Sequence, residues 1–328
     1  MIVPDRMRAA YVEALGPADS ILVGDLPVPK PGPTDALVEV EATVVNPVDT
    51  LVRSGRFATR TPFPFVIGRD LVGTVAAAGE GAGFAAGDRV WCNSLGHDGR
   101  QGAFAQYALV SADRLYRLPD GVDATTTVAV AHPAVTAYLA WFEHARVRAG
   151  ETVYVGGAAG NVGRAALTMA KHAGARVVAS AGPADRDRCL AAGADAVVDY
   201  HDADVAGALR AAAPDGVDIF WDTSGRQSLA LALETVSTGG RVLVTAAGSG
   251  DQHLPIVPFY TRDISLLGFV ISRASASSFA GAARTINALL RDGLLDATLA
   301  DDLPLSAAPQ AHARMESGSV RGRLIVRP

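Results

Sequence analysis

The feature that most constrains this chain is a glycine-rich turn at residues 153–163, with the sequence VYVGGAAGNVG. A short apolar strand enters the turn and a helical segment leaves it, which is the context of a dinucleotide-binding fingerprint. Small residues let the backbone approach a pyrophosphate, and the N–H groups at the helix start face that anion. The predicted cofactor-binding residues here are Gly157, Ala158, Ala159, Gly160, Asn161, Val162 and Gly163. The alternative is a tight turn that binds no ligand.

Residues 123–271, around this turn, alternate between short apolar strands and helical segments. The strands are expected at residues 152–155, 176–179, 196–198, 217–221 and 241–245. Repetition of this βαβ kind predicts a parallel sheet with helices on both faces. We therefore expect a doubly wound (Rossmann) dinucleotide-binding domain over residues 123–271.

Residues 1–122 have a different pattern, in which short Val-rich segments such as 36–42 and 71–77 are separated by Pro and Gly. Many short strands with such turns predict a compact β-barrel domain. After about residue 272 the pattern predicts two helices, at 277–291 and 307–317, and a last strand at 323–326. The expected fold class is α/β, with a β-barrel domain and a doubly wound parallel-sheet domain.

Charge and composition exclude several kinds of partner. The formal net charge is −5 and the pI about 5.8, without the basic stripe that a nucleic-acid partner requires. No apolar run is long enough to cross a bilayer, and the first residues lack the apolar core of a signal peptide, so we expect a cytoplasmic protein without a membrane partner. Two cysteines, Cys92 and Cys189, are too few for a disulfide framework or a four-cysteine zinc lobe.

The choice between NADH and NADPH depends on the end of the second strand of the doubly wound domain. NAD-binding folds usually place an acidic residue there, to hold the ribose 2′-hydroxyl. Here the strand is expected to end at Ser180, and Arg186 and Arg188 follow. A neutral strand end with nearby guanidinium groups suits the extra phosphate of NADPH. The alternative is that both arginines are solvated helix residues.

Several short motifs occur in one order along the chain. They are NPVD at 46–49, GRDLVG at 68–73, GDRV at 87–90, GAFAQY at 102–107, TAY at 136–138, the turn at 157–163 and DTSG at 222–225. On these motifs the chain resembles the zinc-independent quinone oxidoreductase (zeta-crystallin-like) group of the medium-chain dehydrogenase/reductase superfamily, over nearly its whole length.

The resemblance implies a GroES-like catalytic domain at residues 1–122 that residues 272–328 return to complete, and a cleft in which the nicotinamide meets the substrate. It also implies individual roles for residues. By carry-over from the family, Tyr200 flanks the adenosine, Arg186 binds the 2′-phosphate, Thr136 and Asn46 lie near the nicotinamide, and Gly248, Phe269 and Val270 line its other side.

The zinc-dependent alcohol dehydrogenases of the same superfamily hold their catalytic metal through Cys, His and Cys. The matching positions here are Asn46, Arg69 and His132, and an amide, a guanidinium and one imidazole do not form a zinc site. Without a Lewis acid, hydride delivery to a quinone or an activated C=C bond is favoured, since charge spreads over a conjugated system. The expected partner is therefore a small electrophile, a quinone or an α,β-unsaturated carbonyl compound. The alternative is an NADPH-binding protein with a structural or sensing role.

The predicted catalytic residues are His132 and Asn46. His132 precedes a segment expected to be helical, and the start of a helix would lower its pKa. A neutral imidazole there would donate a hydrogen bond to a developing enolate or hydroquinone oxygen. The alternative is a histidine that fills the space of a metal and is hydrogen-bonded to Asp70 or Asn46.

The segment 265–271 is apolar and is predicted to be the last strand of the nucleotide-binding sheet. A long hydrophobic edge strand left open invites aggregation, and pairing with a two-fold copy would cover it. We therefore expect a homodimer, as the family resemblance also implies.

Overall fold

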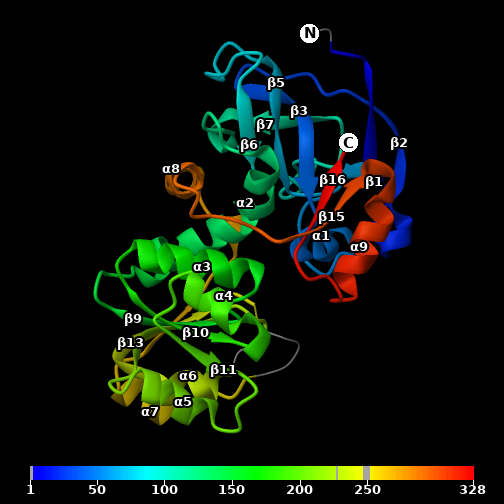
Figure 1. The fold of residues 1–328 in the computed structure, drawn as a ribbon. Coiled ribbons are helices and arrows are strands. Elements are labelled where there is room, and N and C mark those ends of the chain that lie inside the picture. Colours follow the sequence, from blue (N-terminus) through cyan, green and yellow to red (C-terminus); the bar gives the residue numbers. More distant parts are fainter. Residues whose placement is uncertain (1–2, 227, 247–251) are drawn as a thin grey trace. The chain divides into compact units, whose positions relative to one another are not determined.

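The computed structural model describes residues 3–226, 228–246 and 252–328 (Figure 1). The chain forms two compact units. Unit 1 contains Met1–His132 and Ser275–Pro328, and unit 2 contains Pro133–Ala274. The α/β fold class predicted from the sequence is confirmed. In the parts of the chain that are described, no helix is both long and apolar enough to cross a membrane.

Unit 1 is built from two sheets. One has the order β2-β1-β4, and the other has the order β15-β16-β3-β5-β6-β8, with β7 also paired to β3. The strands are β1 (Arg6–Val12), β2 (Leu22–Pro27), β3 (Asp35–Val44), β4 (Phe65–Val66), β5 (Asp70–Ala78), β6 (Arg89–Cys92), β7 (Tyr107–Ser111), β8 (Tyr116–Arg117), β15 (Leu299–Pro304) and β16 (Arg323–Arg327). The GroES-like strands therefore lie in two sheets, and the described strands do not form one closed barrel.

The last strand of the chain joins the sheet of unit 1. β16 pairs antiparallel with β3, with Ile325 opposite Val44, and the Val45 N–H donates to the Leu324 carbonyl over 3.1 Å. This pairing brings residues near 323 next to residues near 46. The helices of unit 1 are η1 (Ala18–Ser20), α1 (Pro47–Arg53), η2 (Ala112–Arg114), α8 (Ala276–Arg291), η6 (Leu305–Ala307) and α9 (Ala308–Glu316).

Unit 2 contains a six-stranded sheet in which all neighbouring strands are parallel, with the order β11-β10-β9-β12-β13-β14. This order is that of the Rossmann fold, with β9 and β12 on either side of the point where the order reverses. The strands are β9 (Thr152–Gly156), β10 (Arg176–Ala181), β11 (Ala196–Asp199), β12 (Val217–Asp222), β13 (Val236–Val244) and β14 (Ser265–Gly268).

Helices cover this sheet and bury its apolar side chains, as parallel sheets require. They are α3 (Asn161–His172), η4 (Pro183–Asp185), α4 (Arg186–Ala191), α5 (Val205–Ala212), α6 (Leu229–Thr235), α7 (Ile256–Thr261) and η5 (Ile271–Arg273). A further helix, α2 (Ala124–Tyr138), runs into a π-helical segment, η3 (Leu139–Ala145). Trp141 of η3 packs edge-to-face on Trp221 of β12, with ring centroids 5.1 Å apart, so both indoles belong to the core of unit 2.

Candidate active site

The glycine-rich turn of unit 2 lies at the carboxyl end of β9 and leads into α3. Gly157 has a φ of +64°, which favours glycine, and the Gly160 N–H donates to the Gly157 carbonyl over 2.9 Å. Gly160 caps α3 without any side-chain hydrogen bond to the helix start. The start of α3 thus presents backbone rather than a capping side chain, which is the arrangement that binds anions at helix N-termini.

Gly163 is required by close packing within the turn. A Cβ atom at this position would lie 2.2 Å from the Gly157 carbonyl oxygen and 2.7 Å from the Ala158 Cα. The missing side chain therefore makes room for the turn's own backbone, so that the first turn of α3 can lie against it. Ala158 is fully buried, and its N–H donates to the Ser180 carbonyl of β10 over 2.9 Å. The turn fits the diphosphate of a dinucleotide, because its backbone hydrogen bonds hold it in place and no capping side chain covers the start of α3.

The end of β10 differs from the sequence prediction. The strand continues to Ala181, because Ala181 pairs with Asp199 of β11, and Ser180 is buried with 2% exposure. Burial raises the pKa of Tyr154 to about 12, and a hydrogen bond between the Ser180 side chain and the Tyr154 hydroxyl opposes this rise. The Ser180 side chain therefore points into the core, and Gly182 is the residue that follows the strand.

Tyr200 lies beside this strand end. Its ring is half exposed and contacts His201, and a Cβ atom at Gly182 would lie 3.1 Å from the Tyr200 hydroxyl. Arg186, at the start of α4, is exposed, and its Nη1 donates to the Val197 carbonyl over 2.6 Å. Tyr200 and Arg186 thus flank a strand end that carries no acidic side chain, while one donor of the guanidinium is used by β11.

The other residues predicted to bind the cofactor in unit 2 are spread over separate elements. Thr136 is in α2 and is partly buried. Phe269 and Val270 follow β14, which ends at Gly268 and is shorter than the predicted strand 265–271. The Phe269 ring stacks on His144, with centroids 4.4 Å apart. Gly248 lies outside the described residues.

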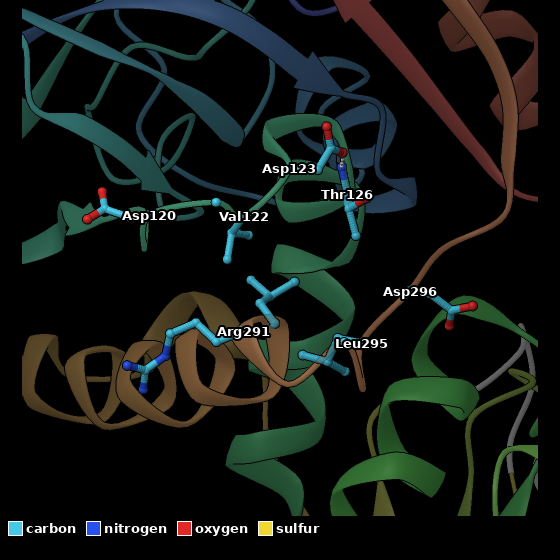
Figure 2. Close-up of a pocket in the computed structure, with 10 residues that line it drawn as sticks. Asp120, Val122, Asp123, Thr126, Arg291, Leu295 and Asp296 are labelled. Atoms are coloured by element: carbon cyan, nitrogen blue, oxygen red, sulfur yellow. Dashed lines mark hydrogen bonds between the residues drawn. The ribbon is translucent and has the colours of Figure 1, made fainter.

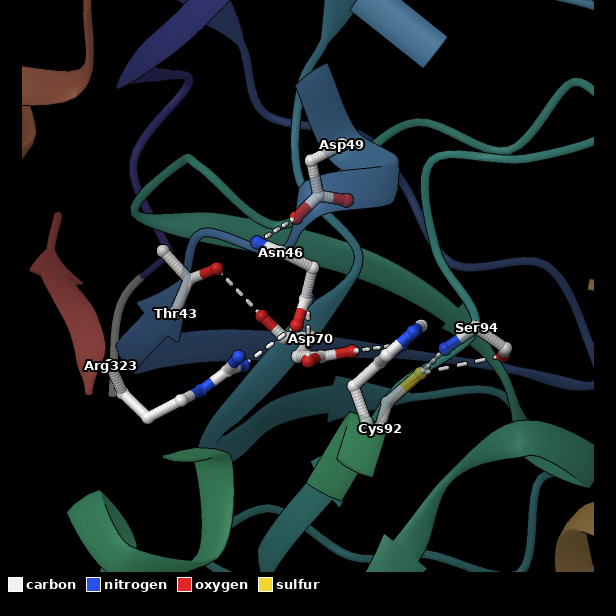
Figure 3. A network of polar contacts seen from close by, with 8 residues as sticks. Thr43, Asn46, Asp49, Asp70, Cys92, Ser94 and Arg323 are labelled. Atoms are coloured by element: carbon white, nitrogen blue, oxygen red, sulfur yellow. Dashed lines mark hydrogen bonds and ion pairs between the residues drawn. The ribbon is translucent and has the colours of Figure 1, made fainter. Parts of the chain in front are cut away.

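Unit 1 contains a buried polar network around Asn46 (Figure 3). Both ends of the Asn46 amide are engaged: Nδ2 donates to Asp70 Oδ2 over 2.8 Å, and Oδ1 accepts from Arg323 Nη2 over 2.6 Å. The Asn46 backbone N–H donates to Asp49 Oδ2, also over 2.8 Å, so that Asp49 closes a capping box at the start of α1. Asn46 has no exposed surface, and it therefore serves the network rather than presenting its amide outward.

Burial dominates the electrostatics of this network. It raises the pKa of Asp70 to about 8, and the neighbouring Asp49 adds to the rise. It also raises the pKa of Asp49 to about 6, although Arg69 opposes the change. Burial lowers the pKa of both Arg69 and Arg323, and the two aspartates oppose this. The network thus holds two cations and two carboxyl groups in a site shielded from water.

The structure corrects the sequence interpretation of His132. This residue lies inside α2, eight residues after its first residue Ala124, and Pro133 is within the helix rather than before it. The pKa of His132 is indeed lowered well below its usual value, but burial is the main cause, with contributions from Arg69 and Arg323. His132 Nδ1 lies 3.9 Å from Asp70 Oδ1, which is longer than a hydrogen bond. The imidazole is therefore neutral at pH 7 and adjacent to the network.

Asn46, Arg69 and His132, the residues at the metal-ligand positions of the zinc enzymes, all contribute to this network or border it. The residue that sequence reasoning missed is Arg323. It is separated from Asn46 by 277 positions, and its only sequence signal was its place at the start of the predicted last strand. Among the described residues, no three His, Cys, Asp or Glu side chains are grouped so that they could hold a metal ion.

An open pocket of about 660 Å³ lies elsewhere in unit 1, between the start of α2 and the end of α8 (Figure 2). Its lining includes Asp120, Asp123, Arg291 and Asp296. Asp123 accepts a hydrogen bond from the Thr126 N–H over 2.6 Å and so caps α2. None of the predicted site residues lines this pocket, and its carboxylates would repel the phosphates of a dinucleotide.

Comparisons with known proteins identify the family of the chain. Residues 32–120 match the family described as alcohol dehydrogenase GroES-like domain, and residues 161–288 match the family described as zinc-binding dehydrogenase. The quinone oxidoreductase of Rattus norvegicus is 32% identical over 98% of this chain and 97% of its own.

Two solved structures extend these similarities. One, titled an NAD-dependent alcohol dehydrogenase, has a TM-score of 0.88 and 31% identity over 98% of this chain and 100% of its own. Another, a mycobacterial protein complexed with NADPH, has a TM-score of 0.83 and 28% identity over 98% and 100%. The chain is thus an oxidoreductase of the medium-chain dehydrogenase/reductase superfamily. Within this superfamily it belongs to the quinone oxidoreductase (zeta-crystallin-like) group.

Proposed function

We propose that this protein is an NADPH-dependent oxidoreductase whose acceptor is a quinone or an activated carbon–carbon double bond. The observation that carries the proposal is the turn after β9, in which Gly157 has a φ of +64° and a Cβ atom at Gly163 would lie 2.2 Å from the Gly157 carbonyl oxygen. When bound, the nicotinamide supplies a hydride. The proposed dinucleotide-binding domain is residues 123–271, and the proposed catalytic domain is residues 1–122 together with 272–328.

The proposed cofactor contacts follow from the positions of the residues. The backbone from Gly157 to Gly163 would hold the diphosphate, Tyr200 would flank the adenosine, and Thr136, Gly248, Phe269 and Val270 would contact the nicotinamide portion. Ser180 does not contact the cofactor directly in this proposal, because its side chain is buried. Its carbonyl instead supports the turn through the Ala158 N–H.

The preference for NADPH over NADH is also a proposal. Gly182 stands after β10 where an acid would hold a ribose 2′-hydroxyl, and Arg186 is exposed nearby. A guanidinium at this strand end favours a 2′-phosphate, since it can form charge-assisted hydrogen bonds with phosphate oxygens. One solved relative is an NAD-dependent alcohol dehydrogenase and another is complexed with NADPH, so titration with both cofactors tests the preference.

Zinc independence rests on the residue types at the network. The Asn46 amide is held at both ends by Arg323 and Asp70, and Arg69 adds a second buried cation. Cations beside a metal position repel a divalent ion, and an amide already bonded to a guanidinium is a poor ligand. Elemental analysis of the purified protein should find far less than one zinc per chain, and chelators should leave turnover unchanged.

The contribution of unit 1 to the reaction is proposed to come from His132. Its neutral imidazole carries one N–H group, which can donate a hydrogen bond to a developing enolate or hydroquinone oxygen. Asn46 then acts through the network rather than by touching the acceptor. The proton that completes the reduction is taken from solvent.

The decisive test is NADPH consumption with a panel of quinones and enones, with binding measured separately. Turnover of at least one acceptor class is the expected result. NADPH binding without turnover on any acceptor would favour a structural or sensing role instead, and the absence of NADPH binding would remove both possibilities.

We also propose a homodimer. β14 is an edge strand of the sheet of unit 2, and Leu266 on it is 39% exposed. On the neighbouring α7, Ile256, Val257 and Tyr260 are each about 60% exposed, with values of 58%, 62% and 62%. Pairing of β14 with its two-fold copy would cover these apolar groups. Light scattering at micromolar concentration should give twice the mass of the chain, and a monomer mass would refute the pairing.

A further inference from the structure

The Asn46 amide could be oriented in two ways, and its neighbours allow only one. With Oδ1 toward Arg323 and Nδ2 toward Asp70, a donor faces an acceptor at both ends. Turning the amide over would place its NH₂ against the guanidinium and its oxygen against the carboxyl group. The contact with the guanidinium would set donor against donor in a buried site, where unmatched polar groups are costly.

Arg323 is the group that comes from farthest away in the sequence. Its side chain is 2% exposed, and among the described residues its Nε atom has no hydrogen-bond partner. Burying a guanidinium is expensive, and buried ion pairs often fail to stabilise a fold relative to apolar replacements. A contribution to the stability of the fold therefore does not explain why an arginine is buried here. Its role in orienting the neighbouring side chains does.

The backbone holds Arg323 rigidly in this place. Its N–H donates to the Thr298 carbonyl over 2.8 Å, and the next residues of β16 pair with β3 directly before Asn46. Asp70 is fixed as well, since its backbone carbonyl accepts a 2.6 Å hydrogen bond from the Thr43 hydroxyl. Two rigid strands thus set the two ends between which the amide is held (Figure 3).

We propose that Arg323 is a positioning residue of the active site: it fixes the Asn46 amide and, through it, the Asp70 carboxyl group beside His132. The proposal rests on the proposed function, because it assigns Arg323 to the site that contains His132. In this interpretation Arg323, at the start of the last strand, fixes the positions of side chains that a bound metal would otherwise hold. Arg323 touches neither substrate nor cofactor.

The test compares Arg323→Gln and Arg323→Lys with Arg321→Gln, which changes an exposed arginine two residues earlier. The first readout is the ¹⁵N–¹H signal of the Asn46 side-chain amide, assigned by its loss in Asn46→Ala. Arg323→Gln should shift this signal and speed its hydrogen exchange at least tenfold. Arg323→Lys should shift it less, because the charge stays while the planar fork is lost. Arg321→Gln should leave it unchanged.

The second readout is turnover with the best acceptor. Arg323→Gln should lower kcat about fourfold, less than removal of His132, with KM changed less than about twofold, since the acceptor and cofactor contacts remain. Adding Asp70→Asn to Arg323→Gln should cost less than the sum of the two single changes, because the two groups act through one amide. If Arg323→Gln does not fold, the same comparison is made with Arg323→Lys.

An unchanged Asn46 amide signal in folded Arg323→Gln would overturn the proposal, as would kcat within twofold of wild type. Loss of thermal stability alone, with amide signal and kcat intact, would also overturn it and leave a purely structural arginine. If the wild-type protein turns over no acceptor, the proposed function fails. The amide signal still decides whether Arg323 orients Asn46.

Discussion

In unit 2 the residues proposed to hold the diphosphate lie between positions 157 and 163, whereas the network of unit 1 joins side chains from positions 46, 70 and 323. The first region is proposed to bind through its backbone, and Gly163 matters because a Cβ atom there would collide with the Gly157 carbonyl oxygen. The second region works through charge, because its carboxyl and guanidinium groups are removed from water. Steric changes should therefore damage unit 2 most, and charge changes should damage unit 1 most.

The largest effect is expected from Gly163→Val. The new Cβ would lie 2.2 Å from the Gly157 carbonyl oxygen, so the turn or the start of α3 must move. Overpacking of this kind costs roughly 1–3 kcal/mol, and we expect the upper end and about a 100-fold loss of NADPH affinity. Affinity is measured by fluorescence titration. Gly268→Ala is the control, because among the described residues its Cβ would meet only the Val244 carbonyl oxygen, at 3.7 Å. NADPH binding by Gly163→Val within threefold of wild type would contradict the steric account of the turn.

The next effect concerns stability and pH in unit 1. Because burial raises the pKa of Asp70 from 3.8 to about 8, the folded protein holds this proton more tightly than the unfolded chain does. Wild type should therefore lose stability relative to Asp70→Asn as pH rises from about 4 to about 8, by at most about 1.4 kcal/mol per pH unit. Above pH 8 the difference should level off.

Denaturant unfolding of both proteins at several pH values measures this difference. Only the change with pH bears on the pKa of Asp70, since the substitution also alters the hydrogen bond to Asn46. A difference between the two proteins that is constant from pH 5 to pH 8 would show that Asp70 titrates normally, and the electrostatic contrast between the units would be lost.

A smaller effect is expected from Arg186→Ala in unit 2. Here the site is proposed to bind the diphosphate through its backbone, and the Arg186 side chain adds a positive charge for the 2′-phosphate. Loss of a charge-assisted hydrogen bond, worth about 1.5 kcal/mol, should weaken NADPH about tenfold and leave NADH within twofold. Arg188→Ala is the matched control, because Arg188 is nearby and its Nη1 lies 3.7 Å from Asp185 Oδ1. Equal weakening of both cofactors by Arg186→Ala would point to loss of its bond to the Val197 carbonyl.

The smallest effect is expected from His132. A neutral donor contributes about 1 kcal/mol, so His132→Ala should lower kcat roughly fivefold, and His132→Gln should restore part of the loss. Because burial lowers the pKa of His132 well below 6.5, the pH profile of wild-type turnover should show no ionisation of His132 near pH 6.5. If His132→Ala keeps full turnover and binds NADPH normally, the residue only fills space.

Features that depend on neighbours in the sequence were predicted well. The α/β fold class, the βαβ repetition and the turn before α3 follow from local glycine placement and apolar periodicity, which act within one or two elements. The sequence predictions were wrong where a helix or strand extends beyond the point at which the local sequence suggested that it begins or ends. A helix was expected to begin after His132, but α2 runs through this position from Ala124 to Tyr138. It continues through Pro133, although a proline has no N–H to donate to the preceding turn.

What the sequence determined by itself is the kind of fold, the place of the glycine-rich turn before α3 and the residue types at positions 46, 69 and 132, which are an amide, a guanidinium and an imidazole. What the tertiary structure decided is how those three residues are held. The pairing of β16 with β3 brings Arg323 to Asn46, and no periodicity or motif encodes that approach. The physical reason is that side-chain charges interact through space, at distances that only the register of distant strands sets, whereas a glycine turn is encoded by consecutive residues.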